Sequence, residues 1–66
     1  MFKKGDKVKW KFQYGETYGI ITHIHNRDFV FMNRQRRASE TSPQYEVMSE
    51  KSGKTAVHKA SALKKI

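Results

Sequence analysis

The sequence has no cysteine among its 66 residues, so neither a disulfide framework nor a thiolate metal site can hold the fold together. Leucine occurs once, as Leu63, and the longest uninterrupted apolar run has four residues, 29–32. Such a run is far too short for a membrane span or for the apolar part of a signal peptide. Acidic residues are scarce, six against fourteen lysines and arginines, which gives a net charge of +8. We therefore expect a soluble, cytoplasmic monomer with an anionic partner and no membrane contact.

The length of the chain limits both its core and its chemistry. We expect one domain, residues 1–66. A chain of about 60 residues buries only about 60% of the surface that it exposes when unfolded, so its core holds few side chains. The serines have no His and Asp at any recognised triad spacing. Residues 53–55 read Gly-Lys-Thr but lack the first glycine of a phosphate-binding loop. The sequence thus predicts no enzyme, no catalytic residue and no cofactor.

The remaining composition favours strands over helices. Val, Ile, Thr, Phe, Tyr and Trp together supply twenty residues, and these side chains suit a pleated, half-buried surface. Residues 7–12 alternate strictly, which places Val8, Trp10 and Phe12 on a packed face and lysines on the other. Further strands are predicted at residues 17–25, 29–32, 44–49 and 55–58, with one helical turn at 61–63. The expected fold is all-β, a small five-stranded SH3-like barrel with one short C-terminal helical turn.

Several local features can be predicted as well. The isoleucines of the second strand do not alternate, which predicts a bulge or sharp bend beside Gly19. Asn26 is expected in a tight turn, since Asn tolerates the left-handed conformation, and Gly53 is expected at positive φ in a hairpin turn. Residues 33–37 either continue the third strand or loop away from it. The large aromatic side chains expected in the core are Trp10, Phe12, Phe31 and Tyr45.

Four short patterns follow one another along the chain. Gly-Asp-x-Val-x-Trp opens it at residues 5–10, and a Gly followed by aliphatic residues ends in His at 25. An Arg-x-Ala-Ser with a following Pro-x-Tyr lies at 36–45, and a Gly, a Val-x-Lys and a Ser-x-Leu close the chain at 53–63. In this order the patterns resemble the hypervirulence-associated protein Tudor domain family over nearly the whole chain. The family usually has a glycine-rich loop where this chain has residues 12–15, and a longer stretch between 25 and 38. The resemblance implies a Tudor-type or SH3-like barrel and no mechanism.

Two groups of cations carry the functional hypothesis. Three lysines share one strand face about 6.6 Å apart, close to the spacing of phosphates along a nucleic-acid strand. The alternative is that they only keep a sheet edge from pairing with other chains. All four arginines lie within eleven residues, and arginine suits bidentate contact with phosphate. With two tyrosines for base stacking, the candidate nucleic-acid-binding residues are Lys7, Lys9, Lys11, Arg27, Arg34, Arg36, Arg37, Tyr14 and Tyr18. This hypothesis requires that they converge into one strip in the folded chain.

Two other kinds of site receive less support. Tyr14 and Tyr18 with Glu16 could form a cage for a methylated ammonium group, but the charge of +8 would repel a cationic ligand. His23 and His25 project from one strand face, with His58 as a distant third ligand for zinc or copper. No cysteine and no obviously placed acid completes such a set, so we predict no metal site and treat these histidines as surface or hydrogen-bonded groups.

The sequence therefore favours a small basic binding module that takes nucleic acid, or another polyanion, with weak specificity. The alternatives are a protein-interaction module that docks an acidic peptide or a partner strand, and a site for a phosphorylated small ligand.

Overall fold

The computed structural model describes residues 2–66, and they are all-β, without an α-helix. All five predicted strands appear within two residues of their predicted ends, and the strand predicted at 29–32 belongs to a hairpin. In chain order the elements are β1 (Lys7–Phe12), β2 (Gly15–His25), β3 (Phe29–Phe31), β4 (Arg34–Arg36), β5 (Gln44–Ser49), β6 (Thr55–Lys59), the 3-10 turn η1 (Ala60–Ala62) and β7 (Lys64–Lys65). Residues 2–66 contain no helix with the length and apolar character needed to span a bilayer.

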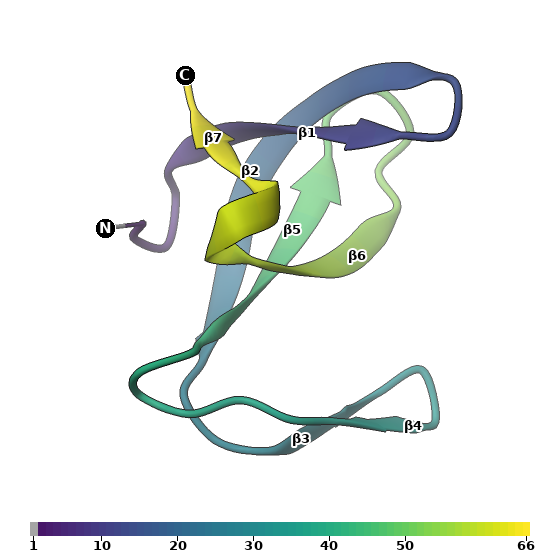
Figure 1. Cartoon of the computed structure of the whole chain (residues 1–66). Coiled ribbons are helices and arrows are strands. Elements are labelled where there is room, and N and C mark those ends of the chain that lie inside the picture. The colour runs from purple at the N-terminus through teal and green to yellow at the C-terminus, as the bar shows by residue number, and fades with distance from the viewer. Residues whose placement is uncertain (1) are drawn as a thin grey trace.

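Five strands form one antiparallel sheet in the order β6-β5-β2-β1-β7, and β3 and β4 form a separate two-stranded sheet. Figure 1 shows β1 and β7 at one end of the molecule and β3 and β4 at the other, with β2 and β5 running between them. The two edge strands of the large sheet, β6 and β7, do not pair with each other. The all-β prediction is confirmed, whereas the SH3-like barrel is confirmed only in part, because the sheet does not close.

The core is small, as the chain length predicts. Six apolar side chains are buried among residues 2–66, and Phe2 and Ala56 pack against them. Phe2 meets the ring of Tyr45 edge to face, with centroids 5.4 Å apart. The prediction that Phe12 belongs to the core is wrong, because its side chain is 50% exposed at the end of β1. The buried apolar residues are Val8, Trp10, Ile21, Tyr45, Val47 and Leu63.

The central pair of strands, β2 and β5, depends on Gly19. A Cβ built there would lie 2.0 Å from the carbonyl oxygen of Met48, so the close approach of the two backbones requires glycine. The predicted irregularity exists but lies farther along the strand, where the register shifts between Ile21 and His23. This shift brings both His23 and His25 onto the face that carries Glu46.

The hairpin of β3 and β4 resolves the alternatives left open for residues 33–37. Its turn residues, Met32 and Asn33, have φ values of 51° and 63°. Two left-handed residues in a row are what a tight two-residue hairpin turn needs, so the chain turns back directly after β3. Asn26 does not adopt this conformation, and the chain enters β3 through a bend instead.

The C-terminal segment contains one feature that the sequence did not indicate. The turn η1 begins one residue earlier than predicted and delivers Leu63 into the core. After it, β7 pairs with β1, with Lys64 opposite Lys9 and Lys65 opposite Val8. The amide of Ile66 donates to the carbonyl of Lys7 at 3.1 Å, which ends the pairing.

Candidate nucleic-acid interface

The lysines of β1 lie on the outer face of the large sheet, as their alternation predicts. They are not equivalent. The ammonium group of Lys7 lies 3.7 Å from the carboxylate of Glu50, and this pairing compensates its charge. Lys9 and Lys11 have no carboxylate within ion-pairing distance among residues 2–66. Two of the three predicted lysines are therefore free to meet an anion.

β7 adds a further lysine to this surface. Lys64 lies directly opposite Lys9 in the antiparallel pair, so the two side chains share a face. Lys65 points the other way and its ammonium group lies 3.7 Å from Asp6. A hollow of about 290 Å³ opens beside the strand pair, lined by Lys9, Lys11, Lys64, Trp10, Glu16, Ser61 and Ala62. Glu16 is the single acid of this lining, against three lysines.

Tyr18 lies on the other side of Lys9. It is the register partner of Lys9 in β2, and its ring is 56% exposed. Lys64, Lys9 and Tyr18 thus form a row across β7, β1 and β2, with the two cations and the ring on the same side. We call Lys9, Lys11, Lys64 and Tyr18 the lysine face.

Tyr14 lies at the turn between β1 and β2 and is 84% exposed. Its ring meets Phe12 edge to face at 6.4 Å, and no ring contact joins it to Tyr18 within residues 2–66. The two tyrosines therefore do not enclose a common space, which argues against the methyl-ammonium cage.

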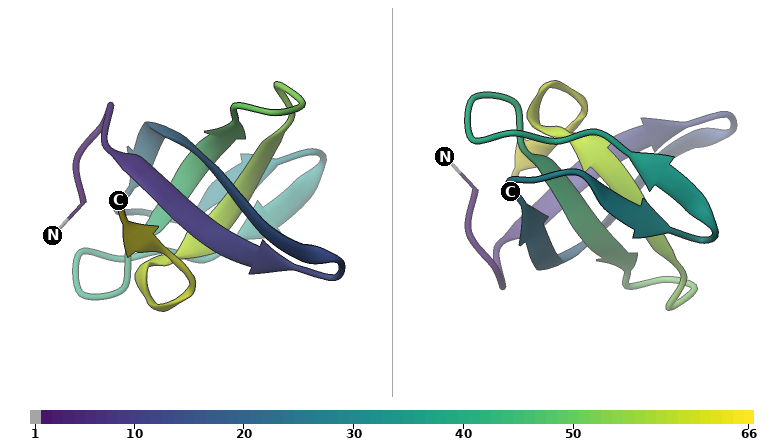
Figure 2. Two further views of the ribbon diagram at one scale, coloured as in Figure 1. Left: turned by 90° about the horizontal axis from the view of Figure 1, so that it is seen from above. Right: turned by 90° about the horizontal axis from the view of Figure 1, so that it is seen from below.

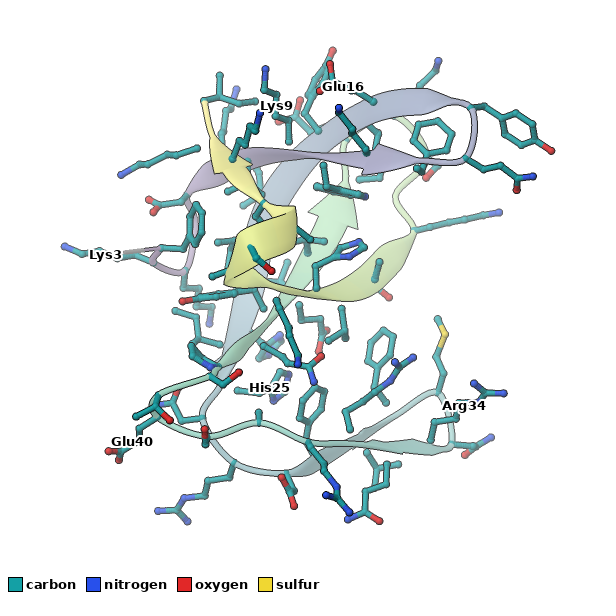
Figure 3. All side chains as sticks on the ribbon, in the orientation of Figure 1. Lys3, Lys9, Glu16, His25, Arg34 and Glu40 are labelled. Carbon is teal, nitrogen blue, oxygen red and sulfur yellow. The ribbon has the colours of Figure 1, made fainter. Side chains whose placement is uncertain are left out.

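The arginines are not brought to this surface. Arg34 and Arg36 belong to β4, Arg37 follows it, and Arg27 precedes β3. Figure 3 places Lys9 at the top of the molecule and Arg34 at the bottom. Figure 2 agrees, because β1 and β7 face the viewer from above and the hairpin of β3 and β4 faces the viewer from below. The expected single strip of lysines and arginines does not form, because β2 and β5 separate the two clusters, so the nine candidate residues do not act together as one surface.

Comparison with known proteins bears on this geometry. The model of the family described as the hypervirulence associated proteins TUDOR domain matches residues 5–63 of the chain. The chain belongs to this family. No curated protein and no solved structure matches it. Tudor-type domains are binding modules, so the surfaces of this Tudor domain that could bind a ligand are its candidate functional sites.

Two of the three histidines of this Tudor domain, His23 and His25, form a cluster with Glu46 that the sequence did not reveal in full. The carboxylate of Glu46 lies 3.5 Å from Nδ1 of His23 and 3.2 Å from Nε2 of His25. The ring of His25 also stacks on Phe29, with centroids 3.7 Å apart. No group of three or more His, Cys, Asp or Glu side chains within residues 2–66 is arranged to hold a metal ion. The cluster joins the end of β2 to the start of β3.

The inner side of β1 opens into an apolar groove of about 390 Å³ between the β1–β2 and β5–β6 turns. Trp10, Phe12 and Ala56 supply its apolar wall, and Lys51 and Lys54 lie along it. His58 lies against Trp10, with ring centroids 5.6 Å apart, and its Nε2 is buried without a hydrogen-bond partner among residues 2–66. Burial lowers the pKa of His58 below its ordinary value of 6.5, so this ring is neutral at pH 7.

Three placements could not be foreseen from the sequence. Lys64 lies within the last three residues, where two adjacent lysines give no strand signal, and it reaches the lysine face only through pairing with β1. Glu46 was not associated with the histidines because it lies twenty-one residues after His25. Lys59 ends β6 and lines a hollow with Arg37, which lies in a distant part of the sequence.

Proposed function

We propose that this Tudor domain binds single-stranded nucleic acid through the lysine face, with weak sequence specificity. The row of Lys64, Lys9 and Tyr18 carries the proposal, because it sets two uncompensated ammonium groups beside an exposed aromatic ring. Cations beside an aromatic platform are the arrangement with which small β domains hold a phosphate backbone and stack its bases. A base must be unpaired to stack in this way, which favours a single strand over a duplex.

The opposed lysines support an anionic ligand on energetic grounds. Like charges directly opposite each other on neighbouring strands destabilise a sheet. Lys9 and Lys64 have this relation, and neither has a carboxylate partner among residues 2–66. A phosphate between them would remove the repulsion, so binding and folding would favour the same geometry. Lysine donates as a point charge without fixed direction, which fits binding that depends little on sequence.

Fluorescence anisotropy with a labelled oligothymidine tests the proposal. If three lysines neutralise phosphates, log K against log salt should have a slope of about −2 for a single strand. The variant Lys9→Gln/Lys64→Gln should bind more weakly, because it leaves one of the three lysines on this face. The matched control Lys3→Gln/Lys4→Gln removes the same charge from the segment before β1 and should bind almost as the unmodified chain does. Absence of binding at low salt, or equal loss in both variants, would reject the proposal.

The role of Tyr18 is tested separately. Tyr18→Ala should weaken binding at least about fivefold, since stacking of one base contributes about 1–3 kcal/mol. Tyr18→Phe keeps the ring and should bind like the unmodified chain. If both variants bind equally well, the ring is not a stacking platform and only the electrostatic part of the proposal survives.

A second candidate function rests on the apolar groove and the open sheet edge. An acidic peptide with an aromatic or aliphatic anchor would fit the wall of Trp10 and Phe12 and the cations Lys51 and Lys54. The unpaired side of β6 would offer main-chain hydrogen bonds to such a segment. Capture of a partner from nuclease-treated lysate that is lost in Lys51→Gln/Lys54→Gln and kept in Lys9→Gln/Lys64→Gln would favour this function. A phosphorylated small ligand would instead shift the NMR signals of either basic surface at low concentration.

A further inference from the structure

A second cationic hollow lies away from the lysine face. It has a volume of about 270 Å³ and is lined by Arg37, Lys59, Ser39, Ser42, Ala38 and Asp28. Arg37 follows β4, Lys59 ends β6, and the two serines belong to the loop before β5. Two separate segments, residues 37–42 and the end of β6, thus bring a guanidinium, an ammonium and two hydroxyl groups to one place, and these groups are the donors that contact phosphate oxygens.

The backbone around this hollow is held in place before any ligand arrives. The side-chain amide of Gln44 is buried and donates to the carbonyl of Arg37. Asp28 accepts a hydrogen bond from the amide of Ala38 at 3.1 Å, and this bond holds the start of the loop against the segment before β3. The amide of Ser42 donates to Oγ of Ser39 at 3.1 Å, and this bond closes the loop. Lys59 is the register partner of Gln44, which fixes it beside the same segment.

The hairpin extends the positive charge beyond this hollow. Arg34 is exposed on β4, and none of the four arginines has a carboxylate within ion-pairing distance among residues 2–66. We call Arg34, Arg37 and Lys59 the arginine end. Arg34 lies at the other end of the molecule from Lys9 (Figure 3), whereas Lys59 directly precedes η1, which lines the hollow of the lysine face. The hollow at Arg37 and Lys59 shares no lining residue with the hollow of the lysine face, so each can take a strand of its own.

We propose that the domain holds two nucleic-acid strands at once, one on the lysine face and one at the arginine end, and so joins separate strands. This inference rests on the proposed function of the lysine face and adds a second, independent phosphate site. The separation of the two cation clusters, which excludes one continuous strip, is what allows two strands to be bound together.

Strand joining can be measured directly. Beads carrying a biotinylated oligothymidine are mixed with the domain and a free fluorescent oligothymidine, and the fluorescence retained on the beads is recorded. Retention should rise well above the level without protein and fall again at excess protein, when each strand is saturated separately. Lys9→Gln/Lys64→Gln and Arg37→Gln/Lys59→Gln should each abolish retention. Lys3→Gln/Lys4→Gln, with the same loss of charge, should retain as the unmodified chain does.

Binding of one strand, measured by anisotropy, separates failure of this inference from failure of the proposed function. Each double variant should still bind an oligothymidine at its intact site, with a salt slope of about −2 for the three cations there, while the number of strands bound per domain falls from two to one. Single-strand binding without retention would overturn the two-strand inference and leave the proposed function standing. Retention that persists in Arg37→Gln/Lys59→Gln would also overturn it, as would a dimer at the assay concentration in sedimentation. Loss of all binding would overturn both.

Discussion

The large sheet and the β3–β4 hairpin are held by different forces. Five of the six buried apolar side chains belong to strands of the sheet, and the sixth, Leu63, packs against them from the segment between η1 and β7. The hairpin contributes no residue to this core, and its outer side exposes Val30, which is 72% accessible. Stacking of Phe29 on His25 ties it to β2. The apolar core that stabilises this molecule therefore lies with the large sheet. The hairpin carries cations and contributes no side chain to that core.

The largest expected effect breaks the sheet. Ile21 is almost fully buried at the centre of β2, so Ile21→Ala should lower the free energy of unfolding by about 2–5 kcal/mol. The matched change in the hairpin, Val30→Ala, should alter it by no more than about 0.5 kcal/mol, because the side chain is exposed. Urea unfolding followed by tryptophan fluorescence measures both. Equal losses would show that the hairpin is as much a part of the core as β2.

A smaller effect is expected at the turn of the hairpin. Met32 is a non-glycine residue with φ of 51°, a conformation that costs about 1–2 kcal/mol for most side chains. Met32→Asn with Asn33→Gly should relieve this strain and stabilise the hairpin by about 1 kcal/mol. Amide hydrogen exchange should slow in β3 and β4. Slower exchange confined to these strands would confirm that the hairpin opens independently, whereas slowing throughout the molecule would show that the two regions unfold together.

The smallest of the three effects is a dependence of the free energy of unfolding on pH, caused by His58 in strand β6 of the sheet. Because the pKa of His58 is lowered by burial, the unfolded chain takes up a proton near pH 6.5 while the folded chain resists it. Stability should be full above pH 6.5 and should fall as the pH drops below 6.5 toward the lowered pKa of the folded state. Urea midpoints between about pH 8 and about pH 5 measure this, and His58→Gln should flatten that part of the profile. An unchanged profile in this variant would assign the acid sensitivity to other groups.

The strands with strict alternation could be predicted from sequence alone. Residues 7–12 and 44–49 were placed at their observed ends, because one face of each packs on the core and the other meets water. The prediction failed for Phe12 because alternation shows which side of a strand a residue faces but not whether the strand extends beyond the core, as β1 does at Phe12. It also missed β7, whose two lysines become a strand only through hydrogen bonds to β1.

The candidate site could be predicted only in part, and the reason is topology. Sequence spacing placed Lys9 and Lys11 on one face, whereas the position of Tyr18 opposite Lys9 follows from the register of β1 with β2. The relation between the lysines and the arginines depended on the path of β2 and β5 across the molecule, which no local pattern encodes. Arg37 lines its hollow with Ser39 and Ser42 of its own loop and with Lys59 of β6, and only the position of Lys59 depends on the topology.

The two-residue strand β7 has a consequence for how tightly the lysine face can bind. The pairing of Lys64 and Lys65 with β1, the amide of Ile66, the ion pair of Lys65 with Asp6 and the burial of Leu63 keep the third lysine in position. Edge strands this short open readily, and each opening would carry Lys64 away from its neighbour. Binding of nucleic acid to the lysine face and pairing of β7 with β1 are then thermodynamically linked. Bound nucleic acid should therefore protect the amide of Ile66 from exchange with solvent.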